Sequence, residues 1–191
     1  MNLVFQAAET LQQLLRERGW GFCFIGGLAV QHWGEPRVTR DVDVTLLTGF
    51  GNEEPFVRAL LTRFQPRVAE ADFWDKALRH RVALLQHPNG VGVDVALGAL
   101  PFEERAVQRA VDVTFLGDWK LRLCSAEDLV VMKSFASRER DWLDVKTILI
   151  RRGRELDWSL ILTELRPLAE LKEAPEIMEQ LERFRRQLIA P

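Results

Sequence analysis

Two aspartates separated by a single residue carry the clearest chemical signal in this chain. Asp41 and Asp43 alternate with valines in Asp41-Val42-Asp43-Val44, a pattern typical of a strand. Residues two apart on a strand point to the same side, so both carboxylates would share one face. Two adjacent acids repel each other unless a cation lies between them. Because Mg²⁺ is commonly held by one or two carboxylates together with substrate phosphates, this spacing predicts a metal-assisted phosphoryl or nucleotidyl transfer site.

A double glycine lies upstream of the acids, where a phosphate could be held. Gly26-Gly27 follows residues 22–25, which predict a short apolar strand, and precedes residues 28–32, which fit a short helix. Glycines at such a junction let backbone N–H groups approach a ligand at the positive end of the helix, and phosphate is the usual ligand. The alternative is a tight turn with no ligand, because glycine marks turns in any case.

A third acid interrupts an apolar run further along the chain. Asp94 lies within residues 91–97, which follow residues 81–86 across Asn89-Gly90, and this pattern predicts a two-stranded hairpin. A buried Asp is rare unless it is paired or bound to a metal. If its strand neighbours that of the two earlier acids, three acids would surround one or two cations, since adjacent strands lie about 4.8 Å apart. The alternative is an Asp on the solvent face of a half-exposed sheet.

A polar stripe in the last third of the chain offers further charged groups. If one continuous helix runs through this region, the 3.6-residue period puts five polar residues on one face: Lys133, Ser137, Arg140, Asp141 and Asp144. The other faces are largely apolar, so the helix would be mostly buried and the stripe would line a cleft. The alternative is a solvated face with helical ion pairs, each contributing roughly 0.2–0.5 kcal/mol.

The elements that would position these groups change in kind along the chain. Residues 1–124 mix helical and strand patterns, whereas residues 125–191 are helical, with breaks near Gly153, Pro167 and Pro175. The sequence therefore predicts an α/β (α+β) fold. A small mixed sheet with its helices would form the core in the first part, and a C-terminal helical bundle would pack on this core and close the active-site cleft.

Composition narrows the class of protein. The chain has 191 residues, of which 47% are hydrophobic and 28% charged, as in an ordinary soluble globular protein. Its formal net charge of −2 means that any nucleic-acid contact must come from local patches. Cys23 and Cys124 lie far apart in apolar runs, which favours core positions over a disulfide. With no signal peptide and no run of about 18 apolar residues, we expect a cytoplasmic protein without a membrane segment.

Two short basic runs could form such local patches. Arg151-Arg152-Gly153-Arg154 is the first, and Arg183-Phe184-Arg185-Arg186 lies near the C-terminus. Basic patches of this kind could guide a tRNA or another RNA acceptor. The alternative is that they are solvated helix ends, where cations interact favourably with the helix dipole.

Two blocks of residues resemble a known superfamily. Gly26-Gly27, then Trp33-Gly34, then Arg37-x-Thr39-x-Asp41-x-Asp43 is similar to the signature of the nucleotidyltransferase (polymerase-β-like) superfamily. A later block runs from Ser125 through Lys133 to Arg140-Asp141-x-x-Asp144. It resembles the AbiEii-type branch, the nucleotidyltransferase-like toxins of abortive-infection and toxin–antitoxin systems and their relatives. The likeness covers about residues 5–150.

The resemblance implies a catalytic role for the matched acids and for one lysine. Asp41 and Asp43 would bind Mg²⁺, with two metals expected, and Asp94 would be the third acid, which orients or deprotonates the attacking hydroxyl. Lys133 and Asp141 would match the essential later Lys and Asp of the branch.

The resemblance also implies a set of nucleotide-binding residues: Gly26, Gly27, Arg37, Thr39, Lys133 and Asp144. In this set the glycine turn would hold the triphosphate, and Arg37 and Thr39 would steady phosphates. The chain departs from many superfamily members in having Gly27 where they have Ser, although branch members often have Gly there too.

The function that the resemblance implies is Mg²⁺-dependent transfer of an NMP from an NTP, such as ATP, to a hydroxyl. The acceptor could be RNA, with a tRNA end foremost, a protein or a small molecule, and a toxin would have a cognate antitoxin. The contrasting hypothesis is a catalytically inactive member that binds nucleotide or a partner protein. The presence of all three acids and the lysine favours the enzyme.

Overall fold

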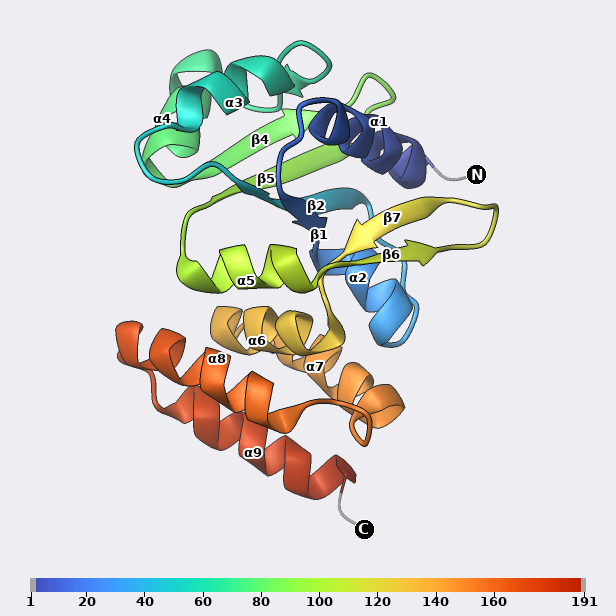
Figure 1. The fold of residues 1–191 in the computed structure, drawn as a ribbon, viewed down its shortest axis with the longest axis vertical. Coiled ribbons are helices and arrows are strands. Elements are labelled where there is room, and N and C mark those ends of the chain that lie inside the picture. Colours follow the sequence, from blue (N-terminus) through green and yellow to red (C-terminus); the bar gives the residue numbers. More distant parts are fainter. Residues whose placement is uncertain (1–2, 190–191) are drawn as a thin grey trace. The chain divides into compact units, whose positions relative to one another are not determined.

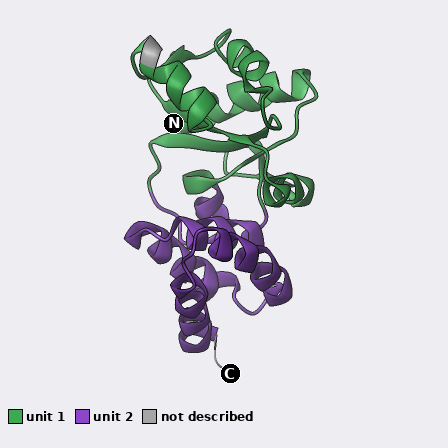
Figure 2. Cartoon of the chain, turned by 90° about the vertical axis from the view of Figure 1, so that its left-hand side faces the viewer, with its two compact units in different colours: residues 1–28, 38–124 green, residues 29–37, 125–191 purple. Residues whose placement is uncertain are grey.

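The chain divides into two compact units, which are shown in Figure 2. The structure is a computed structural model that describes residues 3–189. Unit 1 is built from residues 1–28 and 38–124, and unit 2 from residues 29–37 and 125–191. This differs from the division expected from the sequence in one segment, because residues 29–37 group with the helical unit.

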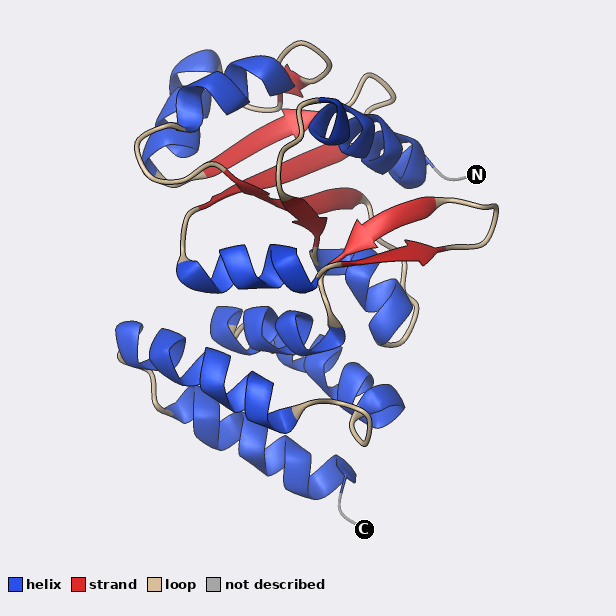
Figure 3. Ribbon diagram, in the orientation of Figure 1, coloured by secondary structure: helices blue, strands red, loops and turns tan. Residues whose placement is uncertain are grey.

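Unit 1 contains a mixed sheet. In chain order its strands are β1 (Phe22–Phe24), β2 (Asp41–Leu47), β3 (Gln65–Pro66), β4 (Val82–Gln86), β5 (Gly92–Gly98), β6 (Val111–Thr114) and β7 (Lys120–Leu123). They form a seven-stranded sheet in the order β3-β4-β5-β2-β1-β7-β6 (Figure 3). The pairs β2·β5 and β1·β7 are parallel and the other pairs are antiparallel. The predicted hairpin across Asn89-Gly90 is the β4·β5 pair.

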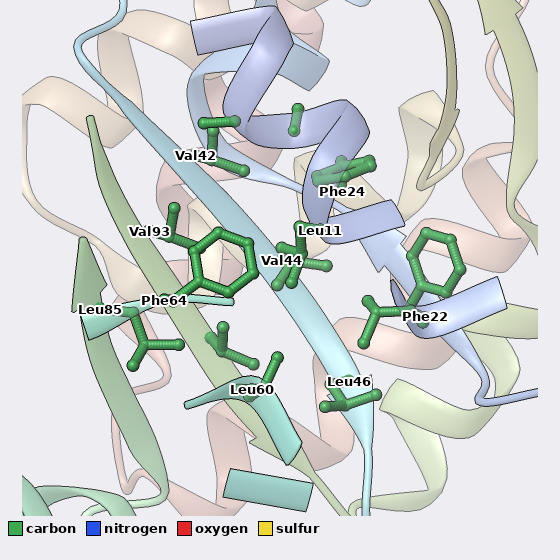
Figure 4. Close-up of a cluster of buried hydrophobic side chains, with 14 of the residues drawn as sticks. Leu11, Phe22, Phe24, Val42, Val44, Leu46, Leu60, Phe64, Leu85 and Val93 are labelled. Carbon is green, nitrogen blue, oxygen red and sulfur yellow. The ribbon is translucent and has the colours of Figure 1, made fainter. Parts of the chain in front are cut away.

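One face of this sheet is buried under helices. The helices α1 (Leu3–Glu17), α3 (Glu53–Leu60) and α4 (Glu70–Arg79) supply apolar side chains to a single cluster with the sheet. Within it, Val42 and Val44 of β2 and Val93 of β5 lie near Leu11 of α1 and Leu60 of α3 (Figure 4). Burying each such side chain contributes about 1.5–3 kcal/mol, so a slip of one residue in register would be very costly.

The opposite face of the sheet carries the acids. Because strand side chains alternate, the burial of Val42 and Val44 fixes Asp41 and Asp43 on the other side. The helix α5 (Pro101–Arg109) covers the far end of this second face, where a Cβ at Gly98 of β5 would lie 3.3 Å from the Glu103 side chain. The core therefore decides which side of the sheet the polar residues occupy.

Unit 2 is helical. Its helices α6 (Ala126–Ala136), α7 (Glu139–Arg152), α8 (Trp158–Leu171) and α9 (Glu176–Ile189) follow one another along the chain (Figure 1). The helix α2 (Gly26–Trp33) begins in unit 1, and its residues from Ala29 onward belong to unit 2. Ser125 caps α6, because its Oγ accepts a hydrogen bond from the Asp128 N–H at 3.0 Å.

Two expectations about the helical third are wrong. The helix thought to run continuously past Lys133 ends at Ser137, which adopts a left-handed conformation with φ 58°, and α7 begins two residues later. Pro167, expected to mark a break, lies inside α8. The sequence signals failed because a serine can end a helix in this conformation without a glycine, and because tertiary packing tolerates a proline within a helix.

The predicted fold class is confirmed, since the chain is a mixed α/β protein with a seven-stranded sheet. The short β3 and the helix α4 were not expected from the sequence. Among the α4 residues whose side chains are described, only Phe73 and Ala77, four residues apart, are fully buried, so the apolar stripe that would have indicated the helix is narrow. Across residues 3–189, we find no helix with both the length and the apolar character needed to span a membrane.

Candidate active site

The acids of unit 1 meet through the pairing of β2 with β5. Asp43 is the register partner of Asp94, and Asp41 is the partner of Gly92. Residues directly opposite each other on paired strands point to the same side. All three carboxylates therefore lie on one face, which we call the acid face (Asp41, Asp43 and Asp94). The condition on which a three-acid site depended, that the two strands are neighbours, is therefore met.

The glycine turn packs directly against the second acid. The Ile25 N–H donates to the Asp43 carbonyl at 2.9 Å, which joins the end of β1 to β2. Gly26 has φ 58°, and a Cβ there would lie 2.5 Å from Asp43 Cγ. The Gly27 N–H points to Asp43 Oδ2 at 3.4 Å, so the carboxylate lies at the positive end of α2. Gly26 is therefore required both by the backbone conformation and by its contact with Asp43.

Thr39 links the glycine turn to the first acid. A Cβ added to Gly27 would lie 2.7 Å from Thr39 Cβ and would overlap the Thr39 hydroxyl. The same hydroxyl donates to the Asp41 carbonyl at 3.2 Å and lies 3.4 Å from Asp41 Oδ1. Thr39 thus occupies the space that a serine at position 27 would need. As long as Thr39 keeps this position, there is no room for a side chain at position 27.

The third acid has a partner that the sequence did not reveal. Arg67 Nη2 donates to Asp94 Oδ1 at 2.6 Å, and both side chains are about one-third exposed. Burial raises the pKa of Asp94; the nearby Arg67 acts against this rise, while the neighbouring Asp41 adds to it. Arg67 follows the very short β3, and no local pattern in the sequence indicates its contact with β5.

The acid face fits a hard divalent cation by donor type. Carboxylate oxygens are the ligands that Mg²⁺ prefers. Asp41 acts to raise the pKa of Asp94, as a neighbouring negative charge does. Within residues 3–189, however, no three His, Cys, Asp or Glu side chains are grouped so that they could hold a metal ion as they stand. Metal ligation by Asp41, Asp43 and Asp94 therefore stays a prediction.

The charged residues expected in the helical third form a separate cluster within unit 2. Lys133 of α6 contacts Asp141 Oδ1 at 2.9 Å and Asp144 Oδ2 at 2.8 Å, both on α7. Arg37 binds Asp144 through Nε at 2.9 Å and Nη2 at 3.0 Å. Arg138 Nε donates to Asp141 Oδ2 at 2.6 Å. We call these five residues the ion network: Arg37, Lys133, Arg138, Asp141 and Asp144.

The two carboxylates of the ion network are buried, and each is paired with two cationic side chains. Asp141 is 1% exposed and Asp144 is 4% exposed. Burial acts to raise the pKa of each carboxyl group, but hydrogen bonds outweigh this effect. Asp141 accepts them from Arg138 and Lys133, and Asp144 accepts them from Arg37 and Lys133. Both pKa values therefore lie below the ordinary range. Both acids are therefore ionised and engaged, which suits fixing other groups in place better than accepting a proton.

The structure changes which residues join this cluster. Arg140, expected in the polar stripe, is exposed, and Arg138 makes the contact with Asp141 instead. The signal that could have found Arg138 is its three-residue spacing from Asp141, the distance at which side chains meet on a helix. Lys133 and Asp141 still come together although they lie on different helices, because the break at Ser137 sets α7 beside α6.

Comparisons with known proteins bear on the family of the chain. Residues 14–188 match the family described as nucleotidyl transferase AbiEii toxin, type IV toxin–antitoxin system. None of the curated protein sequences matches the chain. Among solved structures, an antigenic nucleotidyltransferase-like protein from Paracoccidioides brasiliensis is similar with a TM-score of 0.52 and 16% identity, covering 94% of this chain and 92% of that one. At this identity the likeness concerns the fold alone.

Two further solved structures are similar at lower scores. The lincosamide antibiotic adenylyltransferase LnuA, bound to lincomycin, has a TM-score of 0.48 and 13% identity over 73% of this chain and 92% of that one. The antibiotic-resistance factor ANT(2'')-Ia has a TM-score of 0.47 and 13% identity over 97% and 93% of the two chains. The family match, which spans nearly the whole chain, confirms the resemblance predicted from the motifs. The chain belongs to the AbiEii family of nucleotidyltransferases, enzymes of nucleotidyl transfer.

Proposed function

We propose that this nucleotidyltransferase moves an NMP from an NTP to a hydroxyl of RNA, with Mg²⁺ at the acid face. The observation that carries the proposal is the register that puts Asp43 beside Asp94 and Asp41 beside Gly92. When bound, Mg²⁺ would neutralise charge on the phosphates and lower the pKa of the attacking hydroxyl. ATP is the first NTP to test, and the cytoplasm, where NTPs and RNA meet, is the proposed place of action.

The chain's own groups take distinct roles in this proposal. Asp41 and Asp43 would hold the metal, and Asp94 would orient or deprotonate the acceptor hydroxyl. The raised pKa of Asp94 suits a group that accepts a proton, since its carboxylate holds a proton more readily than an ordinary Asp. Gly26 and Gly27 hold Asp43 against the start of α2, and Thr39 steadies Asp41 from the other side.

Lys133 is the group of the ion network proposed to contact an anionic substrate. Two of its three ammonium N–H groups are engaged by Asp141 and Asp144, and its side chain is 12% exposed. In this role Asp141, Asp144 and Arg37 act by holding Lys133 and one another in place.

A basic surface on unit 2 supports RNA as the acceptor. One arginine of each basic run lines a hollow of about 580 Å³ there, Arg154 from the first run and Arg185 from the second, together with Trp158. A neighbouring hollow of about 480 Å³ is lined by Arg166, Arg183 and Arg186. Only two glutamates, Glu179 and Glu182, accompany these five arginines.

An aromatic ring in this surface suits stacking on a base. The Arg185 guanidinium lies over the Trp158 ring at 4.5 Å, and the Trp158 indole N–H donates to the Gly153 carbonyl at 3.0 Å, which fixes the ring. Arginines that bind phosphates, next to a fixed aromatic ring, are the features with which proteins bind single-stranded RNA. A protein acceptor or a small-molecule acceptor would not require them.

Transfer assays test this function. The protein is incubated with Mg²⁺, each α-labelled NTP in turn, and total RNA, purified tRNA or lysate protein. Label in RNA is expected, and its yield should fall steeply with salt because phosphate contacts carry the binding. Asp41→Ala and Asp43→Ala should abolish labelling while circular dichroism remains unchanged. The matched control is Asp112→Ala, which removes a surface acid that is 58% exposed.

Other outcomes are equally informative. Label in protein, with none in RNA, would replace the RNA acceptor by a protein. NTP binding by calorimetry with no product in any fraction would favour the alternative of a catalytically inactive protein that binds nucleotide. Full activity of both Asp variants would refute the assignment of the acid face.

A toxin role is the remaining part of the proposal. It follows from the family description alone and predicts that expression of the wild-type chain arrests growth, whereas the Asp43→Ala variant does not. Relief of the arrest by the product of a neighbouring open reading frame would identify the antitoxin.

A further inference from the structure

One cation of the chain itself already lies on the acid face. The Arg67 guanidinium binds Asp94 at 2.6 Å, and it also lies over Gly92. A Cβ at Gly92 would lie 3.4 Å from Arg67 Cζ and would overlap Nη1, while it would lie 3.7 Å from Asp41 Cβ. Gly92 is the register partner of Asp41. The guanidinium therefore reaches the acid face between the first and the third acid, and a glycine makes room for it.

The backbone of Arg67 is held well away from this position. Its N–H donates to the Leu84 carbonyl at 2.9 Å, which extends the pairing of β3 with β4. Leu84 is in turn the register partner of Asp94 on β5. The side chain thus reaches across β4 to the next strand, a span of about two strand spacings or roughly 10 Å. Ordering so long a side chain costs conformational entropy, so the negative charge of the acid face must offset this cost.

A nearby arginine shows what an ordinary ion pair looks like in the same unit. Arg63 pairs with Glu17 at 2.6 Å, and its side chain is 33% exposed, against 34% for Arg67. The length and the exposure of the two contacts are therefore alike. Arg67 differs from Arg63 because it engages an acid that shares a face with two others, so Arg67 stands where a divalent cation is expected.

We propose that Arg67 is a built-in counter-cation of the acid face, which competes with the divalent cation for the Asp94 carboxylate. The inference rests on the proposed function, since it takes the acid face to be the metal site. Arg67 balances part of the negative charge when no metal and no nucleotide are bound, and it keeps Asp94 in place. It also lowers the affinity of the free enzyme for metal, because a dication must displace the guanidinium or lie beside it.

Calorimetry of Mn²⁺ binding in the absence of any NTP tests this inference without relying on activity. The wild-type protein is compared with Arg67→Gln, which keeps a polar side chain and removes the charge. We expect Arg67→Gln to bind Mn²⁺ about tenfold more tightly, because both the competition and the charge repulsion are lost. Arg67→Lys keeps a cation and should bind much as the wild type does.

Two controls separate competition at Asp94 from a general effect of charge. Arg63→Gln removes an equally exposed arginine from the same unit and should leave the Mn²⁺ affinity within about twofold of wild type. In an Asp94→Asn background the further change Arg67→Gln should gain much less than tenfold. A full tenfold gain in that background would overturn the competition.

The result also distinguishes the inference from the proposed function. Equal Mn²⁺ affinity in the wild type and Arg67→Gln, or weaker binding in the variant, overturns the counter-cation while leaving the metal site intact. If neither protein binds Mn²⁺, the acid face is not a metal site, and both the inference and the metal-dependent function fail.

Discussion

The acid face of unit 1 and the ion network of unit 2 contain the same kinds of residue, but their carboxylates differ in how they are paired. On the acid face Asp94 contacts one arginine, Arg67, whereas in the ion network Asp141 and Asp144 each contact two cations. In the sequence both looked like chemistry-bearing clusters. The difference teaches that charge balance, more than residue type, separates carboxylates that need a cation from those that already have one.

The same difference appears in the pKa directions. Burial acts to raise the pKa of Asp94 and Asp141 alike. In Asp141 the hydrogen bonds from Arg138 and Lys133 reverse the effect, whereas in Asp94 the single Arg67 does not. Burial by itself therefore does not mark a functional acid; the partners decide.

Among variants that keep all three acids, the largest effect on activity is expected from the glycine that supports the acid face. Gly26→Ala places a Cβ 2.5 Å from Asp43 Cγ and strains a backbone with φ 58°. Asp43 must move, and a displacement of about 1 Å at a catalytic group costs on the order of 100-fold in rate. Nucleotide transfer is measured at saturating NTP. Gly49→Ala has comparable strain at φ 72° with nothing within 4 Å, so it should retain activity; equal losses in both variants would mean that strain alone matters.

A loss of stability is expected from the ion network. Asp141→Ala leaves Lys133 and Arg138 without the carboxylate that they share. Breaking a buried ion pair by removing one partner costs about 3–5 kcal/mol. Urea unfolding followed by circular dichroism measures this change. A loss of less than about 1 kcal/mol would mean that the network contributes little to folding, and the contrast with the acid face would weaken.

The two regions should respond to acid in opposite directions. The folded-state pKa of Asp141 is lowered, so the folded protein holds fewer protons than the unfolded one, and the stability from Asp141 is present at neutral pH and lost as the pH falls toward and below 3.8. The folded-state pKa of Asp94 is raised, so its ionised form opposes folding at neutral pH, and this penalty disappears as the pH falls.

Asparagine variants check this sign in the metal-free protein. Asp141→Asn should be less stable than wild type at pH 7, with a difference that shrinks toward pH 3.5. Asp94→Asn should be slightly more stable at pH 7, by less than about 1 kcal/mol, with a difference that also shrinks in acid. Urea midpoints across this range provide the measurement. A destabilised Asp94→Asn at neutral pH would show that the contact with Arg67 outweighs burial.

The smallest effect on stability is expected from an ion pair that belongs to neither the acid face nor the ion network. Arg16 and Asp112 form a surface pair at 2.8 Å, with side chains 49% and 58% exposed. Exposed pairs are usually worth about 0–1 kcal/mol, so Arg16→Ala should change the free energy of unfolding by less than about 0.5 kcal/mol. A larger loss would mean that ion pairs in this protein cannot be ranked by exposure.

Much of the acid face could be predicted from the sequence because it depends on the alternation of residues within single strands. The alternation around Asp41 and Asp43 fixed both acids on one side of β2, and Asn89-Gly90 announced the hairpin that carries Asp94. The pairing of β2 with β5 was a conditional expectation, which the register then met. The contact of Arg67 with Asp94 could not be predicted from the sequence, because the two residues are 27 positions apart and lie on either side of an intervening strand.

The ion network shows the opposite case. Its residues were chosen on the assumption of one continuous helix, and the helix ends at Ser137. Lys133 and Asp141 nevertheless meet, through two helices, and Arg138 takes the place expected of Arg140. The residue types were informative, but the geometry that was to bring them together was wrong.

By itself, the sequence determined the family, the α/β class and the face of β2 on which its acids lie, because motif spacing and strand alternation are properties of short stretches of chain. Only the tertiary structure decided which charges are balanced. In it, Asp94 forms an ion pair with Arg67, Asp141 and Asp144 form ion pairs with Lys133, and the Thr39 side chain packs against Gly27. These contacts join residues from different elements, and their energies depend on distance and burial, which no local pattern records.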